Sequence, residues 1–284
     1  MAPGVRLAVQ ESPGQEPATV LLHGLASTHH WWDLVTELLP GRRVVRWDHR
    51  GHGLSTIPTG RHSVEDLARD AAAVLDAAGL QQCIVAGHSL GAAVGLRLAA
   101  DRPDLVAALC CVDGGLYDPQ TMFGRSWWDA QPAMRLDRRI APTEAMLTAW
   151  AHGIGLPAAA VPALLANYQP DPSDPRRVRL RLPAEHEGPL AYSLWSQRPA
   201  DLLARVDVPV TAVLARTADR AAAAVRRRAL HHTLDGAGRT VTERWIDGGH
   251  DLPLEQPHRV ADAILDLLEH ATLAVPAVGA RMSA

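Results

Sequence analysis

The sequence predicts an α/β fold: a mostly parallel, doubly wound sheet into which a helical segment is inserted. Short apolar runs, such as those at residues 19–23, 82–87 and 105–112, alternate with segments of helical spacing. Continuous apolar runs are typical of strands buried on both faces of a sheet, and the alternation predicts helices on both sides of it. Over residues 117–200 the alternation stops, and a proline-broken helical pattern replaces it.

The expected elements follow one another in a regular order. Strands are predicted over residues 5–9, 19–23, 43–48, 82–87, 105–112, 208–215 and 239–246. Helices of the core are predicted over residues 31–39, 63–78, 89–100, 220–230 and 255–271. We therefore divide the chain into a sheet core (residues 1–116 and 201–271), a helical cap (117–200) and a flexible C-terminal tail (272–284).

Local signals support the ends of these elements. Proline and glycine at residues 13–17 predict a turn after the first strand. Ser63, with Asp66 three residues later, is a typical helix N-cap, and Gly79 is a typical C-cap. These signals support the helix predicted over residues 63–78.

The composition is that of an ordinary globular protein and limits the classes of function. Of the 284 residues, 47% are hydrophobic and 21% are charged, so a sizeable hydrophobic core is expected. A net charge of −3 gives no electrostatic reason to bind nucleic acid or a membrane. The sequence has no apolar run that could span a bilayer and no secretory signal, which predicts a cytoplasmic location.

Several chemistries are also disfavoured. All 28 basic residues are arginine, which excludes a lysine nucleophile. The three cysteines, Cys83, Cys110 and Cys111, lie in apolar runs without metal-finger spacing and are expected to be buried thiols. The 14 histidines show no H-E-x-x-H pattern, so no metal and no organic cofactor are expected.

The clearest chemical motif is Gly-His-Ser-Leu-Gly at residues 87–91, between a predicted strand and a predicted helix. This is the context of a G-x-S-x-G nucleophile elbow, in which a sharp turn presents the serine at the edge of the sheet. The flanking glycines remove side chains that would clash in such a turn. Ser89 is therefore predicted as the nucleophile, and His88 is expected to shape the turn.

A serine nucleophile of this type needs a histidine base and a carboxylate, in the chain order Ser, Asp, His. His250 lies in a Gly-Gly-His-Asp loop after the last predicted strand and is predicted as the base. Asp219, after the strand at 208–215, and Asp113, after the strand at 105–112, are both candidates for the acid. We favour Asp219, whose strand lies nearer the histidine strand in the usual order, and keep Asp113 as the alternative.

An oxyanion hole is expected beside the serine. One donor is the backbone N–H of Leu90, the residue after the nucleophile. The other is expected from the His23-Gly24-Leu25 loop after the second strand, with Leu25 as the donor. Fixed backbone donors stabilise charge that develops only in the transition state.

These motifs, together with the segment DHRGHGLS at residues 48–55, resemble the α/β-hydrolase superfamily over about residues 5–271. The resemblance is to its esterase, epoxide hydrolase, haloperoxidase-like and C–C hydrolase branches. It implies a structural role for the 48–55 turn and a cap, residues 117–200, over the site. Relatives usually carry a glycine three residues before the acid, where this chain has Arg216.

Aromatic residues are the candidates for the substrate pocket. We expect four tryptophans to bind a flat or apolar group, namely Trp31, Trp128, Trp150 and Trp195. Four arginines between residues 176 and 181 form a basic run in the cap. That run either attracts an acidic or coenzyme-A-linked substrate or is a solvated helix face.

The function predicted from the sequence is that of a serine hydrolase, which cleaves a carboxylic ester, lactone or thioester through an acyl-enzyme. Two alternatives stay open: a C–C hydrolase or an acyltransferase or cyclase with the same triad, and a non-catalytic ligand-binding protein with this fold. The expected partner is a small-molecule substrate, without nucleic acid or membrane. A homodimer is compatible with the sequence, but nothing in the sequence specifies one.

Overall fold

The computed structural model describes residues 4–60, 62–136 and 141–274. Its strands are β1 (Val9–Ser12), β2 (Gln15–Leu22), β3 (Arg42–Trp47), β4 (Cys83–His88), β5 (Val106–Val112), β6 (Tyr168–Asp171), β7 (Asp174–Leu180), β8 (Val210–Arg216) and β9 (Thr242–Asp247). Its α-helices are α1 (Asp33–Thr36), α2 (Val64–Ala77), α3 (Leu90–Asp101), α4 (Pro119–Phe123), α5 (Trp127–Met134), α6 (Glu144–Gly153), α7 (Val161–Leu165), α8 (Ala184–Trp195), α9 (Pro199–Leu203), α10 (Arg220–Ala237), α11 (Leu252–Glu255) and α12 (Pro257–Ala274). Two short 3₁₀ helices are η1 (His29–Trp32) and η2 (Ala158–Ala160).

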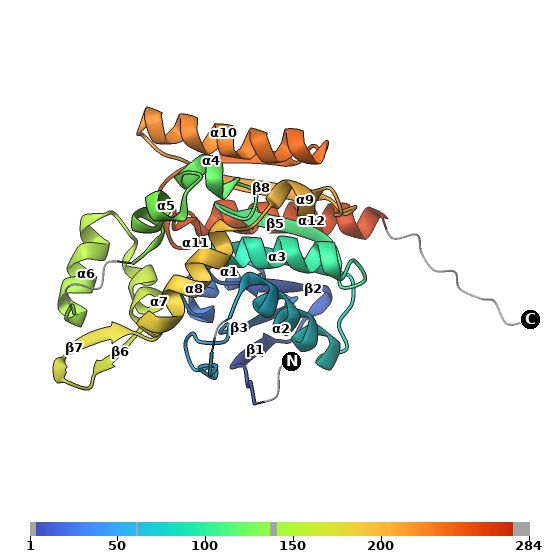
Figure 1. The fold of residues 1–284 in the computed structure, drawn as a ribbon. Coiled ribbons are helices and arrows are strands. Elements are labelled where there is room, and N and C mark those ends of the chain that lie inside the picture. The colour runs from blue at the N-terminus through green and yellow to red at the C-terminus, as the bar shows by residue number, and fades with distance from the viewer. Residues whose placement is uncertain (1–3, 61, 137–140, 275–284) are drawn as a thin grey trace, which may run out of the picture.

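Seven strands form one sheet in the order β1-β3-β2-β4-β5-β8-β9. The β1 strand is antiparallel to β3, and all other neighbours are parallel. Helices α2, α3, α9 and α10 cover one face of the sheet, and α1, α11 and α12 cover the other (Figure 1). The mostly parallel, doubly wound architecture predicted from the sequence is confirmed.

The carboxyl ends of β4, β5 and β8 meet at one edge of the sheet, because neighbouring parallel strands end together. Gly87 pairs with Cys111, and Cys111 pairs with Ala212. The central strands β4 and β5 are buried along their whole length apart from Ala107. Side chains that follow these strands are therefore brought together on a rigid support.

The segment between β5 and β8 differs from the expected all-helical cap. Helices α4–α9 are present, but β6 and β7 form an antiparallel hairpin that projects from the cap (Figure 1). The side chain of Asp171 accepts hydrogen bonds from the backbone N–H and the hydroxyl of Ser173, which stabilises the turn. Pro170 and Pro175 obscure the strand pattern of this hairpin in the sequence. Both lie in a two-stranded hairpin, where a missing N–H donor is tolerated.

The first strand also differs from the prediction. It covers Val9–Ser12 instead of residues 5–9, and β2 begins at Gln15 and includes Pro17. The β1 strand lies at the sheet edge and is largely exposed, so its sequence VQES carries no continuous apolar run. Pro17 lies where the register with β3 shifts, between Gln15 and Thr19.

The C-terminal part was also predicted with different bounds. The helix α10 continues to Ala237, seven residues beyond the expected end, and α12 begins at Pro257 and continues to Ala274. The first residues of the expected tail are therefore helical, and residues 275–284 lie outside the described residues. In the part of the chain that is described, no helix has both the length and the apolar character needed to cross a membrane.

The turn at residues 48–55 has the structural role expected for it. The carboxylate of Asp48 accepts hydrogen bonds from the backbone N–H of His29 and of Leu54, each at 2.8 Å. Arg50 donates two hydrogen bonds to the buried Asp70 of α2, both at 2.6 Å. These contacts connect the loops after β2 and β3 to α2.

Candidate active site

Ser89 occupies the sharp turn between β4 and α3. Its backbone has φ 54° and ψ −115°, in the left-handed half of conformational space that residues other than glycine rarely adopt. A Cβ at Gly91 would lie 2.1 Å from the carbonyl oxygen of Leu22, and one at Gly87 would lie 2.2 Å from the carbonyl oxygen of Gly91. Only glycine fits at these two positions, so the pattern of residues 87–91 enforces the turn.

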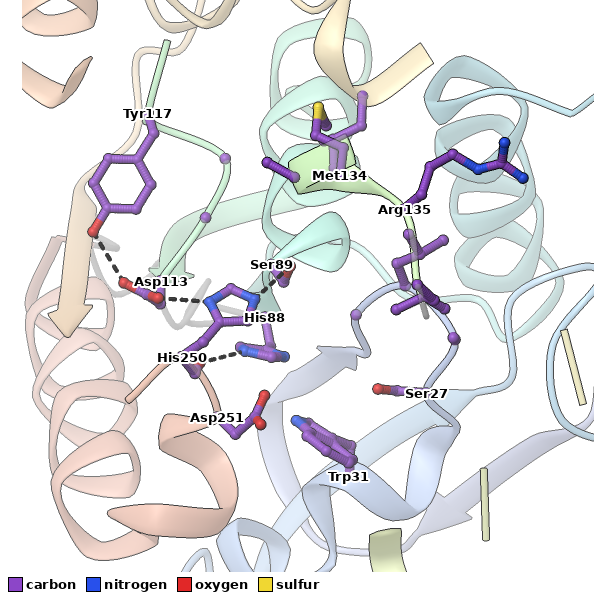
Figure 2. A pocket seen from close by; sticks show the side chains of 18 of the residues that line it. Ser27, Trp31, His88, Ser89, Asp113, Tyr117, Met134, Arg135, His250 and Asp251 are labelled. Carbon is purple, nitrogen blue, oxygen red and sulfur yellow. Dashed lines mark hydrogen bonds and ion pairs between the residues drawn. The ribbon is translucent and has the colours of Figure 1, made fainter. Parts of the chain in front are cut away.

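The imidazole of His250 connects Ser89 to a carboxylate (Figure 2). Its Nε2 lies 3.0 Å from Ser89 Oγ, and its Nδ1 lies 2.6 Å from Asp113 Oδ2. Because a carboxylate only accepts hydrogen bonds, Nδ1 carries the proton and Nε2 is free to accept from the serine hydroxyl. This is the arrangement in which a histidine can take a proton from serine.

The carboxylate of Asp113 is held from several sides. It accepts hydrogen bonds from the Tyr117 hydroxyl and the Ala215 N–H, both at 3.0 Å, and Arg226 Nη1 lies 2.7 Å from both of its oxygens. Burial raises the pKa of Asp113, but the hydrogen bond from His250 and the positive charges of His250 and Arg226 outweigh it and lower the pKa to about 2. Asp113 is therefore a stable anion beside the imidazole.

The acid favoured from the sequence, Asp219, is not the residue that contacts His250. It is the N-cap of α10, and its exposed side chain accepts hydrogen bonds from the backbone N–H of Ala221 and Ala222. Asp113 ends the strand beside β8 and has φ 42°, which turns its side chain toward His250 (Figure 2). The preference for Asp219 was wrong, and the alternative, Asp113, occupies the position.

The pKa of His250 is raised above its usual value. Burial lowers it, but the hydrogen bond and negative charge of Asp113 outweigh this effect, and Asp251 raises it further. The positive charge of Arg226 acts in the opposite direction. About half of the imidazole surface remains exposed to the cavity, which leaves room for a substrate.

His88 supports the histidine loop, as expected of a residue that shapes the site. Its Nε2 donates a hydrogen bond of 2.8 Å to the carbonyl oxygen of His250, and its ring is stacked against Trp31. Burial and the nearby His250 together lower the pKa of His88 to about 3, so the ring is neutral. His88, His250 and Asp251 lie close enough together to ligate one metal ion, although His250 is already engaged by Ser89 and Asp113.

The predicted oxyanion donors belong to backbone beside Ser89. Leu90 is the first residue of α3, where backbone N–H groups have no partner within the helix. A Cβ at Gly24 would lie 3.3 Å from the Cβ of Ser89, so the loop after β2 passes close to the nucleophile. Leu25 follows Gly24 and lines the same cavity as Ser89.

A cavity of about 470 Å³ opens in front of the serine. Its wall is mainly apolar, and the cap contributes Met122, Phe123, Met134, Tyr168 and Leu194. The segment 117–200 therefore forms part of the wall of the site, as a cap would. A cavity of this size and character is typical of a site for a small organic molecule.

Only one of the four predicted pocket tryptophans lines this cavity, namely Trp31. Trp128 is 79% exposed, and Trp150 lines a separate cavity between α6 and β7. Trp195 packs against Trp127 and donates to the carbonyl oxygen of Gly124. These three assignments were wrong because the direction of a side chain on a cap helix depends on how the cap packs.

Sequence reasoning missed the residues that surround the acid and the base. Tyr117 and Arg226 hold Asp113, and Asp251 lines the cavity beside His250. Arg226 is one of three consecutive arginines in α10, so its type gave no signal. The Gly-Gly-His-Asp loop did mark Asp251, but nothing in the sequence indicated the direction of its side chain.

The basic run of the cap lies on a strand, not on a helix. Arg176, Arg177 and Arg179 are exposed on β7, and Arg181 follows it. Arg176 pairs with Asp174, and Arg181 donates to the carbonyl oxygen of Ala166. None of the four lines the cavity at Ser89.

Comparisons with known proteins agree with this architecture. A family model described as alpha/beta hydrolase fold matches residues 17–141. The putative carbamate hydrolase RutD of Azorhizobium caulinodans is 37% identical over 105 residues, which cover 37% of this chain and 40% of that protein. RutD of Caulobacter segnis is 40% identical over 98 residues, or 34% of this chain and 37% of that protein. The chain thus matches about two fifths of the length of these curated relatives.

Solved structures match nearly the whole chain. E-2-(acetamidomethylene)succinate hydrolase superposes with a TM-score of 0.72 at 22% identity, covering 93% of this chain and 98% of that one. The thioesterase domain from the curacin biosynthetic pathway gives 0.70 at 20% identity, covering 93% and 97%. The fold is therefore that of the α/β hydrolases. The family model over residues 17–141 and the RutD relatives agree with this fold.

Proposed function

We propose that the protein is a serine hydrolase that cleaves a carboxylic ester, lactone or thioester of a small, partly apolar substrate. The observation that carries this proposal is the continuous hydrogen-bonded series from Ser89 Oγ through His250 to Asp113. A serine hydroxyl is a weak nucleophile at neutral pH, and an adjacent base oriented by a third group is what activates it. The mainly apolar cavity in front of Ser89 gives such a substrate room.

The geometry supports a two-step reaction. His250 Nε2 accepts the proton of Ser89 Oγ while the oxygen attacks the substrate carbonyl carbon, and Asp113 stabilises the resulting imidazolium. The backbone N–H groups of Leu90 and Leu25 hold the oxyanion. His250 then gives the proton to the leaving group, and the acyl-enzyme forms. A water molecule, deprotonated by His250, attacks the acyl-enzyme and releases the acid.

The similar proteins are consistent with this class of substrate. Their names describe a carbamate hydrolase, a thioesterase domain and a thermophilic esterase. Carbamates, thioesters and esters all present a carbonyl carbon bound to a leaving heteroatom, which is the group that an activated serine attacks. The C–C hydrolase and acyltransferase alternatives would use the same triad, so a substrate panel is needed to separate them.

Labelling with a fluorophosphonate tests the proposal. We expect the intact mass to show one adduct, peptide mapping to place it on Ser89, and Ser89→Ala to abolish it while the circular dichroism spectrum stays unchanged. Ser196→Ala, which removes a hydroxyl that donates to a backbone carbonyl in α8, is the matched control and should label normally. A folded wild-type protein that forms no adduct would contradict the proposal and support the ligand-binding alternative.

A further inference from the structure

The proposed mechanism gives no role to two charged residues of the cavity wall, Arg135 and Asp251. Arg135 pairs with Glu187 of α8, and Asp251 is the one that lies beside the catalytic histidine. It follows His250 in the loop after β9 and lines the same cavity as His250 and Trp31 (Figure 2). Its side chain is partly buried, and it is set in a mainly apolar wall. A carboxylate in such a place has a cost of desolvation, so its interactions need an explanation.

The fold does not use this carboxylate to build the loop. Asp251 is the N-cap residue of α11, the position at which an aspartate side chain commonly accepts from the helix N–H groups, but it makes no such bond. The carboxylate of Glu255 accepts instead from the backbone N–H of Gly249 and of Asp251. Among the residues that the structure describes, none donates a hydrogen bond to the carboxylate of Asp251.

The charges near Asp251 favour a cation in front of it. Burial raises the pKa of this carboxyl group, and the negative charges of Glu255 and Asp113 raise it further, against the opposite effect of His250. A positively charged ligand would relieve this repulsion and replace the lost hydration. The indole of Trp31 on the same wall adds an aromatic surface, which attracts alkylammonium groups.

The position of Asp251 also indicates which half of the substrate it would contact. In the proposed reaction, His250 delivers a proton to the leaving group, so the leaving group lies against the imidazole when it departs. Asp251 lies close to this imidazole, and Trp31 lines the same cavity (Figure 2). A charge on the leaving group would therefore come close to both residues.

We propose that Asp251 and Trp31 form a subsite for an alkylammonium group in the leaving-group portion of the substrate. This inference rests on the proposed function. Asp251 supplies the counter-ion, and Trp31 supplies the aromatic face. The preferred substrates are then esters or thioesters whose leaving group carries a positively charged nitrogen.

Two acetate esters of nearly identical shape test this subsite. Choline acetate carries a quaternary nitrogen where 3,3-dimethylbutyl acetate carries a neutral carbon. We expect the wild-type protein to have a kcat/KM ratio, charged over neutral, on the order of tenfold, as for a partly desolvated cation held against an aromatic face. Asp251→Asn should bring this ratio close to one. Asp207→Asn, which removes a fully exposed carboxylate, should keep the wild-type ratio.

A wild-type ratio near one, or the same ratio in Asp251→Asn, would overturn the subsite. Labelling of Ser89 by the fluorophosphonate separates this result from a failure of the proposed function. In that assay, tetramethylammonium should slow labelling of the wild type and leave the rate in Asp251→Asn unchanged. If Ser89 were not labelled at all, the proposed function would fail, and calorimetric titration of both proteins with tetramethylammonium would still decide the subsite.

Discussion

Arg226 Nη1 lies 2.7 Å from both carboxylate oxygens of Asp113, so an arginine of α10 shares this carboxylate with His250. The pair is buried: the Asp113 side chain is fully enclosed, and that of Arg226 is 17% exposed. An arginine so close competes with the imidazolium for the same negative charge. The basicity of His250 is thus a balance between the carboxylate and the arginine behind it.

The identity of the acid can be tested by comparing the two candidate aspartates. Asp113→Asn should reduce kcat/KM by roughly 10³- to 10⁴-fold, because an amide cannot hold the required tautomer of His250. Asp219→Ala should leave kcat/KM near the wild-type value and cost about 1 kcal/mol of unfolding free energy, because it removes an N-cap. Steady-state kinetics and urea unfolding measure the two effects. A large kinetic loss in Asp219→Ala would contradict the assignment.

The pH profile of kcat/KM should move in opposite directions in two variants. Arg226→Gln removes a positive charge that lowers the pKa of His250, so the acidic limb should shift to higher pH. Asp251→Asn removes a negative charge that raises this pKa, so the limb should shift to lower pH. Arg227→Gln is the control, because Arg227 lies over the ring of Trp245 away from the site. Shifts of the same sign in both variants would show that the charges do not act in this way.

As the pH is lowered, the protein should lose stability before its carboxylates begin to titrate. Burial lowers the pKa of His52 to about 4 and of His62 and His88 to about 3, and lowers those of His23 and His49 well below 6.5. Below pH 6.5 these histidines bind protons in the unfolded chain but not in the folded protein. Their contribution to the unfolding free energy is therefore complete above pH 6.5 and is lost as the pH falls. Each contributes at most about 1.4 kcal/mol per pH unit in that range.

Urea unfolding at pH 7.5, 6.5, 5.5 and 4.5 measures this loss. The lowered pKa of Asp113 acts in the same direction only at lower pH, because a carboxylate contribution is lost toward the folded pKa of about 2. Because the pKa of His250 is raised in the folded protein, its contribution to the unfolding free energy remains fully present below pH 6.5. An unfolding free energy that stays constant from pH 7 to pH 5 would be inconsistent with neutral buried histidines.

Two glycine substitutions should have opposite effects on stability. In Gly91→Ala the new Cβ would meet the backbone oxygen of Leu22 at 2.1 Å, so the elbow must shift, at a cost of about 3 kcal/mol. In Gly188→Ala, inside α8, the Cβ meets nothing within 4 Å, and better helix propensity should stabilise by about 1 kcal/mol. Thermal unfolding of both variants provides the comparison. Equal effects would mean that the elbow tolerates a Cβ.

The core of the fold was predictable because its central strands are buried on both faces. Such strands must be apolar throughout, and β4 and β5 appear in the sequence as continuous apolar runs. The β1 strand lacks this signal because it is exposed at the edge, and the β6–β7 hairpin lacks it because it contains Pro170 and Pro175. The pattern of apolar residues along the sequence reflects burial, so it does not predict strands that are exposed.

The nucleophile and base were predictable for a different reason. Ser89 lies in a turn that only certain residues can form, and His250 lies in a loop at the expected sheet edge. The acid was harder, because β5 and β8 are neighbours and an aspartate follows each of them. A single backbone angle, φ 42° at Asp113, turns that side chain toward His250, and no pattern in the sequence encodes it.

The candidate triad joins residues that are 161 and 137 positions apart in the chain. During synthesis, Ser89 leaves the ribosome long before His250 does. Its hydroxyl is therefore not activated until the last strand has joined the sheet and brought His250 into place. A fluorophosphonate that reacts with Ser89 is therefore also a reporter of complete folding, because every nascent or truncated chain that lacks the β9 loop should remain unlabelled.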